Sequence, residues 1–562
     1  MKILMASSEA VPFAKTGGLA DAVSALSLAL AKLGHEVKIV LPRYYNIDRG
    51  KLTLLEGEMG VPVGGFEEWS AVYKTTMPGS PEKNLVEVYF IDHEIFFGRD
   101  GIYGSHFEPD FIDNPRRFTF FSLSVFQLCQ KIKWYPDILH AHDWPTALVP
   151  AFLKFGKREG RFAKTVSVLT IHNLGYQGIY HKDNFHYTGL GWNIYYEQGF
   201  EDWGMMNMLK AGVYAADKLN TVSQTYRDET MTQSSGFRLD GPLNYRNADY
   251  QGIRNGIDDE VWNPSTDKLI PKTYTVKDLS GKAAAKKALQ EAFGLHPDPD
   301  VPVIGMITRL AGQKGIGELF GPSYGSAYSI CHDMNLQFVL IGTGESWCEN
   351  EARRLSSHLS NFKAKIDYSE KLSHLIEAGS DFFLMPSRYE PCGLNQMYSL
   401  VYGTIPIARR TGGLADTIEN YNQETGEGTG FLFDDLTPSS IYNTVGWAIW
   451  AYYNQKEHIK TMRERGMRGD FSWATSARQY VEMYQRALAA IGAKADTQKP
   501  APAAPKAAAK QETAASKPPA APKTAPAKPE TAPKPAPKAP AAKQGTSAAA
   551  AKTGAKPKGK KT

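Results

Sequence analysis

The 562-residue sequence is poor in cysteine and has no long apolar run. Its four cysteines, Cys129, Cys331, Cys348 and Cys392, form no CxxC pair and lack zinc-ligand spacing. This argues against a disulfide framework and a zinc site and indicates a reducing compartment. The first ten residues are too polar for a signal peptide core, and no apolar stretch approaches a membrane span. We therefore expect a cytoplasmic protein with no membrane contact.

Three nucleotide-binding motifs are also missing. Gly342-Thr343-Gly344 lacks the third glycine of a GxGxxG fingerprint, which disfavours a nicotinamide oxidoreductase. No GxxxxGK[ST] phosphate loop occurs. No Asp-x-Asp pair follows a predicted strand, so we expect no metal–diphosphate site and no cofactor. A departing diphosphate would then have to be stabilised by protein cations.

The net charge of +5 conceals two regions of opposite sign. Residues 491–562 hold 15 Lys, no Arg and three acidic residues, a net +12, which leaves −7 on residues 1–490. The acidic body gives no support for nucleic-acid binding. The Ala/Pro/Lys-rich end lacks the apolar residues that folding requires, so we predict a disordered tail over 491–562. It either contacts acidic surfaces or keeps the protein in solution, and both interpretations stay open.

The hexapeptide TGGLAD occurs twice, at residues 16–21 after Lys15 and at residues 411–416 after Arg410. Each copy follows a strand-like run and leads into helix-like sequence. Paired glycines allow a sharp turn close to a ligand, and a helix start offers free N–H groups and a positive dipole end. We therefore predict two similar halves that face each other across a phosphorylated ligand.

Strand-like runs alternate with helix-like stretches through both halves, which is typical of parallel, doubly wound sheets. The predicted strands are residues 3–5, 36–41, 85–95, 136–142, 165–171 and 215–222, then 302–307, 336–341, 381–386 and 404–408. We expect helices at 19–33 and 118–131 and a long loop at 97–117. The predicted domains are residues 1–258 and 259–470, followed by an amphipathic helix at 471–490.

Polar residues gather where the predicted strands end. They are His140, His142 and Asp143; His172 and Asn173; Arg309; Arg388 and Glu390; and Arg410 and Thr411. Ligands of open parallel sheets bind beyond the carboxyl ends of the strands, so this pattern predicts a cleft between the halves.

Four of these strand ends carry candidate chemistry. Arg309 and Lys314 span a turn framed by glycines and can converge on a diphosphate, although a solvated surface pair is the alternative. Glu390 can accept two sugar hydroxyls or stabilise the first turn of a helix. His172 can donate to a hydroxyl near a reacting carbon, although a lone histidine is more often structural. Asp143 can orient an acceptor or cap the helix that starts at Trp144.

The motifs in this order resemble those of the bacterial glycogen synthase and plant starch synthase family. They are KTGGLAD at 15–21, HAHDW at 140–144, IHNLGYQG at 171–178, NGID at 255–258, WNP at 262–264, Arg309 to Gly315, SRYEPCGL at 387–394 and RTGGLAD at 410–416. The resemblance covers residues 1–490 and leaves out the tail. It implies a retaining glucosyltransferase with an α/β fold of two facing Rossmann-like domains (GT-B) and a deep interdomain cleft.

The resemblance also implies the reaction and its residues. Glucose would move from ADP-glucose to the non-reducing-end 4-hydroxyl of an α-1,4-glucan. Lys15, Gly17, Gly18, Arg309, Lys314, Thr411 and the amides of Gly412, Gly413 and Leu414 would bind the nucleotide sugar. Glu390 and His172 would hold the transferred glucose, and Asp143 would place sugar in the cleft. Asp21, His142, Asn173 and Tyr398 are acceptor or structural candidates.

The sequence differs from the family pattern at two positions, and two other functions stay open. Related retaining transferases often have a ribose-binding Glu where this sequence has Tyr398, and Arg254 replaces the usual leucine before NGID. Arg254 would touch phosphate or face solvent. UDP-glucose as donor and a catalytically silent glucan-binding protein are the alternatives to the ADP-glucose enzyme.

Overall fold

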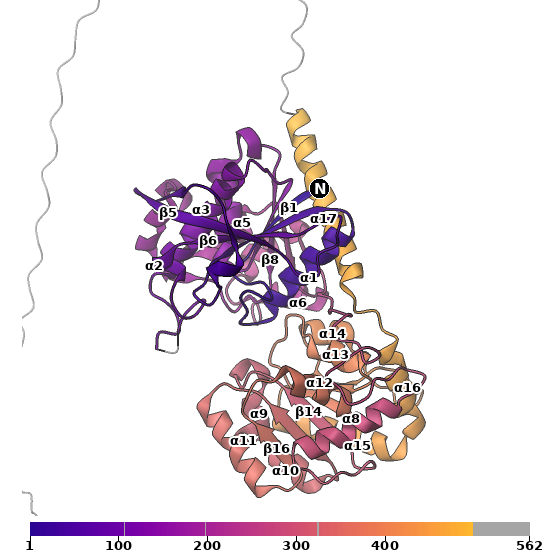
Figure 1. Ribbon diagram of the computed structural model, residues 1–562. Helices are drawn as coiled ribbons and strands as arrows, with labels where there is room; N and C mark the ends of the chain where they lie inside the picture. Colours follow the sequence, from indigo (N-terminus) through magenta and orange to yellow (C-terminus); the bar gives the residue numbers. More distant parts are fainter. Residues whose placement is uncertain (106, 197, 323–324, 498–562) are drawn as a thin grey trace, which may run out of the picture. The chain divides into compact units, whose positions relative to one another are not determined.

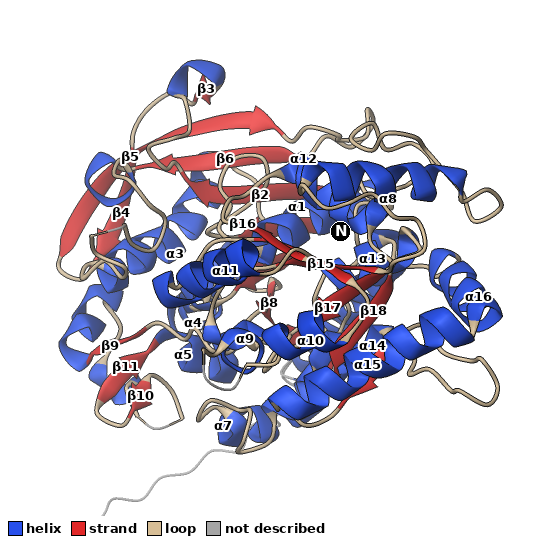
Figure 2. Cartoon of the chain, turned by 90° about the horizontal axis from the view of Figure 1, so that it is seen from below, coloured by secondary structure: helices blue, strands red, loops and turns tan. Residues whose placement is uncertain are grey.

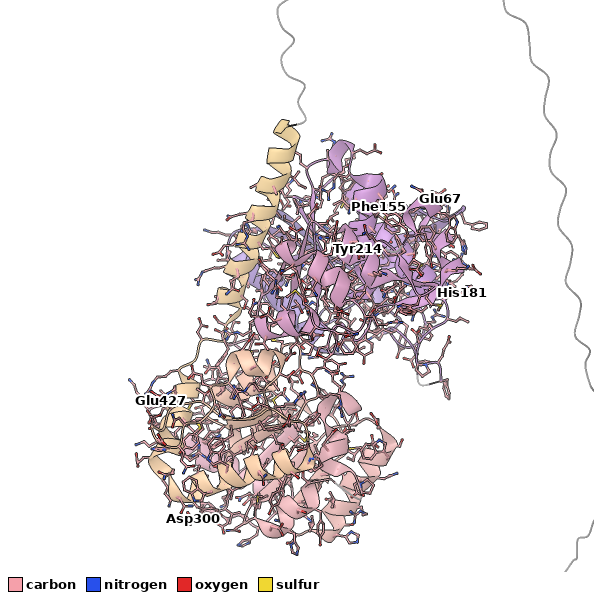
Figure 3. The ribbon with its side chains drawn as sticks, turned by 180° about the vertical axis from the view of Figure 1, so that it is seen from behind. Glu67, Phe155, His181, Tyr214, Asp300 and Glu427 are labelled. Atoms are coloured by element: carbon pink, nitrogen blue, oxygen red, sulfur yellow. The ribbon has the colours of Figure 1, made fainter. Side chains whose placement is uncertain are left out.

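The computed structural model describes residues 1–105, 107–196, 198–322 and 325–497, with side chains described up to residue 491. These residues form two α/β lobes, each with its own sheet and core (Figure 1). Figure 3 shows His181 on the first lobe and Asp300 and Glu427 on the second. Among the described helices, none combines the length and the apolar character that a membrane span requires. The predicted tail lies outside it, apart from its first residues.

The second lobe is built on a six-stranded parallel sheet. Its strands are β14 (Val303–Ile307), β15 (Gln337–Ile341), β16 (Phe362–Lys365), β17 (Phe382–Met385), β18 (Ile405–Arg409) and β19 (Phe431–Phe433). Their order is β16-β15-β14-β17-β18-β19. Successive side chains of a strand point to opposite faces, so Ile304 and Met306 enter one core while Val303 enters another. Both faces therefore need a helical cover.

Helices supply that cover on both faces (Figure 2). They are α8 (Ser280–Ala292), α9 (Ile316–Phe320), α10 (Ala327–Asp333), α11 (Ser346–His358), α12 (Glu370–Gly379), α13 (Asn395–Val401), α14 (Gly412–Thr417), α15 (Pro438–Asn454) and α16 (Lys456–Met467). The strands predicted at 302–307, 336–341, 381–386 and 404–408 are confirmed, whereas β16 and β19 were missed.

The first lobe has the same parallel core in a larger sheet. Its parallel strands are β1 (Lys2–Ala6), β2 (Glu36–Pro42), β6 (Glu87–Asp92), β7 (Ile138–His142), β8 (Val166–Ile171), β12 (Lys218–Thr221) and β13 (Tyr250–Gly252). The order β13-β12-β8-β7-β1-β2-β6 again places the first strand between the second and the fourth of the parallel core.

This sheet is mixed rather than purely parallel, which corrects the prediction. At its edge β6 pairs antiparallel with β5 (Phe66–Thr76), and β5 pairs antiparallel with β3 (Thr53–Leu54) and β4 (Met59–Val63). Short antiparallel strands β9 (Ile179–His181), β10 (Glu201–Asp202) and β11 (Met205–Asn207) form a separate small sheet. These segments alternate polar and apolar residues weakly, so they gave little periodic signal.

The first-lobe helices are α1 (Gly18–Lys32), α2 (Glu94–Phe97), α3 (Asn114–Lys131), α4 (Leu148–Phe152), α5 (Met208–Ala215), α6 (Gln224–Thr230) and α7 (Asp240–Tyr245). The helix predicted from residue 118 begins four residues earlier, at Asn114, with Pro115 in its first turn. That proline is compatible with a helix start, because its missing N–H would be unpaired there in any case.

The last helix, α17 (Trp473–Thr497), follows the second lobe in sequence but packs on the first (Figure 1). Its Tyr480 and Tyr484 are fully buried in the first-lobe core. The helix also continues past residue 490 into the segment predicted as tail. Arg254 donates to the carbonyl of Asp470 at 2.9 Å and lies over the ring of Phe471, so it fastens the chain entering α17.

The two lobes also touch through α6 and α14. The carboxylate of Asp416 accepts from the amides of Gln224 (2.6 Å) and Thr225 (3.2 Å) at the start of α6. The carboxylate of Glu229 accepts from the Thr411 hydroxyl and the Gly412 amide, both at 3.0 Å, at the start of α14. Each helix therefore supplies the acid that satisfies the free amides of the other.

We predict that Asp416→Ala destabilises the protein by about 1–2 kcal/mol, because it leaves the first amides of α6 without an acceptor. Chemical denaturation of the full chain measures this. The control is Asp434→Ala, which removes an exposed carboxylate paired with Arg410 at 2.9 Å and should change stability by less than about 0.5 kcal/mol. Equal effects of the two substitutions would contradict a capping role.

Candidate active site

In each sheet there is one pair of neighbouring strands at which the order of the strands reverses. The carboxyl ends of both pairs border the region between the lobes. In the first lobe, β1 lies beside β7, and in the second lobe β14 lies beside β17. The connections leave these neighbouring strands in opposite directions, which opens a crevice beyond their carboxyl ends. The predicted residues Asp143, Arg309 and Glu390 follow β7, β14 and β17. The sheet topology therefore explains why the polar strand ends converge.

Two adjoining cavities lie there, with volumes of about 680 and about 1030 Å³. The first cavity is lined by Lys15, Asp21, Trp262, Tyr368 and Tyr398 among others, and the second by Asp143, His172, Asn173, Trp144 and Tyr180 among others. Both share one wall, formed by Thr16, Gly17, Gly18, Asn255, Arg309, Lys314, Glu390, Leu394 and Asn395. The cavities therefore meet at the predicted phosphate-binding and sugar-binding residues.

A compact charged group forms part of the shared wall. The ammonium of Lys314 lies 2.6 Å from Oε2 of Glu390, and the hydroxyl of Ser387 donates to the same oxygen at 2.8 Å. Arg309 donates to Oε1 of Gln313 at 3.3 Å and leaves most of its guanidinium available. Lys314 and Glu390 are largely buried, so their pairing fixes both side chains in the wall. The structure brings Arg309, Lys314 and Glu390 together as predicted.

The first TGGLAD copy also faces the cavities. A Cβ added to Gly17 would meet no atom within 4 Å, because the residue borders open space. The N-cap residue of α1 is Gly17, which has no side chain that could cap the start of the helix. Glu9, a buried residue that was not predicted, accepts from the amides of Thr16 (2.5 Å) and Gly17 (3.3 Å) and from the Thr16 hydroxyl (2.8 Å). Glu9 holds the loop so that the start of α1 points into the shared wall. Its position just after β1 was the signal that could have found it.

The second copy does not face the cavities, which corrects the prediction for Thr411, Gly412, Gly413 and Leu414. The amide of Gly412 bonds to Glu229, that of Gly413 to the Glu390 carbonyl, and that of Leu414 to the Thr411 carbonyl. Among the described residues, these four line neither cavity. A Cβ on Gly413 would lie 1.9 Å from the Cys392 carbonyl. These glycines therefore allow backbone packing behind Glu390, and the amides beside them already have partners in the described part of the chain.

Asp143 does not take the capping alternative, and its contact with an acceptor stays a prediction. Its backbone is left-handed (φ 57°), and its side chain does not cap the short helical turn Trp144–Thr146. Its carboxylate instead accepts from the amides of His172 (2.7 Å) and Asn173 (3.4 Å), which ties the end of β7 to the end of β8. Burial raises the pKa of Asp143 to about 7. Asp143 is therefore placed to position His172 and Asn173 on the second cavity.

Aromatic rings line both cavities, and most of them were missed. The ring of Tyr398 stacks on Trp262 (centroids 3.9 Å apart), and Trp262 stacks on His374 at the same distance. Tyr368, three-quarters exposed, follows β16 at the mouth of the first cavity. The second cavity adds Tyr103, Trp144, Tyr176 and Tyr180. Apolar ring faces beside hydrogen-bonding edges suit nucleobases and sugars.

Lys15 and Asp21 lie at the entrance of the first cavity, where their side chains pair at 2.8 Å. Asn173 borders the second cavity, and its side-chain oxygen accepts from the Gly175 amide at 3.0 Å. His142 lies behind the wall and bonds to His172.

The fold and this site together define a two-domain glycosyltransferase.

Comparison with known proteins narrows the class. A model of the starch synthase catalytic domain matches residues 2–245, and one of glycosyl transferases group 1 matches residues 290–465. A glycogen synthase of Treponema denticola is 57% identical over 488 residues, which is 87% of this chain and 99% of that protein. Glycogen synthase 1 of Geobacter metallireducens is 42% identical over 493 residues, 87% of this chain and 96% of that protein.

A solved structure agrees with these sequences. The catalytic domain of starch synthase IV from Arabidopsis thaliana, bound to ADP and acarbose, superposes with a TM-score of 0.78 at 32% identity, covering 87% of this chain and 99% of that one. The chain belongs to the glycogen synthase and starch synthase family. The predicted family, fold class and hexosyltransferase activity are confirmed.

Proposed function

We propose that the protein transfers glucose from ADP-glucose to the non-reducing-end 4-hydroxyl of an α-1,4-glucan, with retention of configuration. The observation that carries this proposal is the wall shared by the two cavities, which contains Arg309, Lys314 and Glu390. One cavity is the right place for a nucleotide and the other for a glucan chain. That ADP occupies a starch synthase of similar fold supports ADP-glucose over UDP-glucose as the donor.

The donor lies in the first cavity with its diphosphate on the shared wall. The Arg309 guanidinium and the Lys314 ammonium neutralise the charge that grows as the bond between glucose and diphosphate breaks. The start of α1 at Gly18 adds its amide and a positive dipole end, beside the Gly17 amide that Glu9 holds at 3.3 Å. Lys15 borders the same cavity and adds a further cation. This set of cations supports a reaction that needs no metal ion, and that remains a prediction.

The transferred glucose lies against Glu390, whose carboxylate accepts two of its hydroxyls. His172, on the second cavity, bonds to the glucose 6-hydroxyl, and Asp143 holds the backbone that carries His172. The C1–O bond to diphosphate breaks, a C1–O4 bond to the glucan forms on the same face of the sugar, and the proton of the 4-hydroxyl passes to the departing diphosphate oxygen. Closure of the lobes excludes water and favours transfer over hydrolysis.

The partners of the protein are thus a nucleotide sugar and an α-1,4-glucan. Four cysteines that are buried and unpaired suit a cytoplasmic enzyme. The mild negative charge of residues 1–490 does not favour nucleic-acid binding. The cationic tail has no assigned partner.

The test is a purified-protein assay in which ADP-glucose and UDP-glucose are each offered with a maltooligosaccharide. We expect a kcat/KM for ADP-glucose at least about tenfold higher, because a pocket distinguishes two similar ligands by about 1–3 kcal/mol. We also expect full activity after EDTA treatment. A preference for UDP-glucose would overturn the donor assignment. Activity that is lost with EDTA and restored by magnesium would overturn metal independence. If neither donor supports transfer, the protein is a catalytically silent glucan-binding protein.

A further inference from the structure

A polar strip crosses the otherwise apolar face of the first sheet under α17. His140 and His142 lie on β7, Thr170 on β8 and Asn220 on β12, with His142 paired to Thr170 and Thr170 to Asn220 in the strand register. All four are essentially buried. Tyr480 and Tyr484 of α17 close the strip from above through hydrogen bonds to Asn220 (2.9 Å) and His140 (2.7 Å). A buried polar group without a partner is costly, so the hydrogen-bond partners in this strip determine which atom carries each proton.

The position of the proton on His140 follows from its neighbours. The hydroxyl of Thr170 donates to the side-chain oxygen of Asn220 at 2.7 Å, so its only hydrogen is used. His140 must then donate its Nε2–H to Thr170 Oγ1 at 2.6 Å. Burial lowers the pKa of His140 to about 3, so the ring is neutral and its Nδ1 carries a lone pair. Tyr484 donates its hydroxyl proton to that lone pair.

The same reasoning applies to the next pair of rings. Nδ1 of His142 lies 3.1 Å from Nε2 of His172, and the rings of His140 and His142 are 4.1 Å apart. Burial lowers the pKa of both His142 and His172, so one ring donates and the other accepts. Nε2 of His142 is buried with no partner in the described part of the chain. An N–H stranded there is less favourable than a lone pair, because buried N–H groups without an acceptor are rare.

We propose that His142 is a positioning residue that fixes the tautomer of His172. His142 donates its Nδ1–H to Nε2 of His172, and His172 therefore carries its own proton on Nδ1. His172 borders the second cavity, and its Nδ1 is the ring nitrogen not bonded to His142. The sugar consequently meets an N–H donor there rather than a lone pair. His140 and Tyr484 support His142 from behind, so α17 contributes to the site without touching substrate.

The proton positions can be read directly in the wild-type protein. A neutron crystal structure of the full chain exchanged into D₂O should show deuterium on Nδ1 of His142 and His172 and on Nε2 of His140. Deuterium on Nε2 of His142 with none on its Nδ1 would overturn the proposal. This measurement depends neither on the assigned reaction nor on the folding of any variant.

The consequence for catalysis rests on the proposed function and is tested with two donors, ADP-glucose and its 6-deoxyglucose analogue. The wild type should prefer the 6-hydroxyl by about 10- to 100-fold in kcat/KM, the range for a hydrogen bond in a desolvated site. His172→Ala should bring this ratio close to one, and His142→Leu should lower it by at least about threefold, because His172 is then no longer held in one tautomer. His142→Asn, which places an amide N–H where Nδ1–H stood, should keep most of the preference.

A purely structural role for His142 would lower kcat/KM for both donors by the same factor and leave the ratio unchanged. That result, or equal ratios in His142→Asn and His142→Leu, would overturn the inference while His172 keeps its assigned role. The double variant His142→Leu/His172→Ala should lose no more of the preference than His172→Ala alone, because the two act as one unit. A wild type that does not distinguish the donors would instead overturn the contact between His172 and the 6-hydroxyl.

Discussion

Lys314→Ala is expected to lower kcat by about 10³-fold while the protein stays folded. One preorganised group that stabilises charge in a transition state is worth about 10²–10³ in rate when removed. Lys314 carries a full charge at the shared wall and also balances Glu390, whose carboxylate lies 2.6 Å away and is largely buried. Its loss leaves the departing diphosphate with less positive charge, and within the described part of the chain it leaves Glu390 with only Ser387 as a close donor. The effect should therefore reach the upper end of that range.

The matched control for this substitution is Arg388→Ala. Arg388 follows the same strand, β17, but it is half exposed, pairs with Glu318 at 2.5 Å and lines neither cavity. We expect its kcat to stay within about twofold of the wild type, since surface ion pairs contribute little. Steady-state kinetics and thermal unfolding of both variants provide the comparison. A kcat for Lys314→Ala within tenfold of the wild type would remove Lys314 from the reaction.

The two glycine turns show how far sequence reasoning reaches. Identical hexapeptides correctly predicted two strand–turn–helix units in two similar lobes. They could not reveal which turn faces a ligand, because that depends on what packs against each from a distant part of the chain. Glu229 and the segment 390–392 fill the space around Gly412 and Gly413, whereas Gly17 borders open space. The same local physics therefore gives a packing contact in one lobe and a binding surface in the other.

The convergence of Arg309, Lys314, Glu390, Asp143 and His172 was predictable because each follows a parallel strand. The rule that ligands bind beyond strand ends needs only the strand assignment. Tyr368 was not predicted because the strand before it was not assigned: β16 is short and partly polar and gave no clear signal. Residues that act from behind the wall could not be found in this way.

Tyr484 and His140 illustrate that second limit. They are 344 positions apart in sequence, and their hydrogen bond exists only because α17 returns to the first lobe. The helical period of residues 471–490 predicted an amphipathic helix but not the lobe on which it packs. Buried histidines in the strand run also offered no sign of a partner until the tyrosines of α17 were placed above them.

Glu390→Gln is expected to lower kcat by about 10²- to 10³-fold without raising the KM for the nucleotide sugar. The amide keeps an oxygen for Lys314 and Ser387, so the wall keeps its geometry, but it carries no negative charge for the sugar hydroxyls or the charge developing at C1. Lys314 also loses its carboxylate partner and becomes a stronger ligand for the diphosphate. Binding of the donor should thus hold or improve while turnover falls, the opposite of a substitution that only weakens binding.

A fall in kcat without a rise in KM distinguishes a catalytic role of Glu390 from a structural one. The control is Glu427→Gln, on the second lobe (Figure 3), which is not among the residues that line either cavity and should leave both parameters within about twofold of the wild type. Initial rates measured over a range of donor concentrations give both parameters for the two variants. A kcat close to the wild-type value for Glu390→Gln would show that the carboxylate is dispensable. A large rise in KM with little change in kcat would show that it serves only to hold the donor.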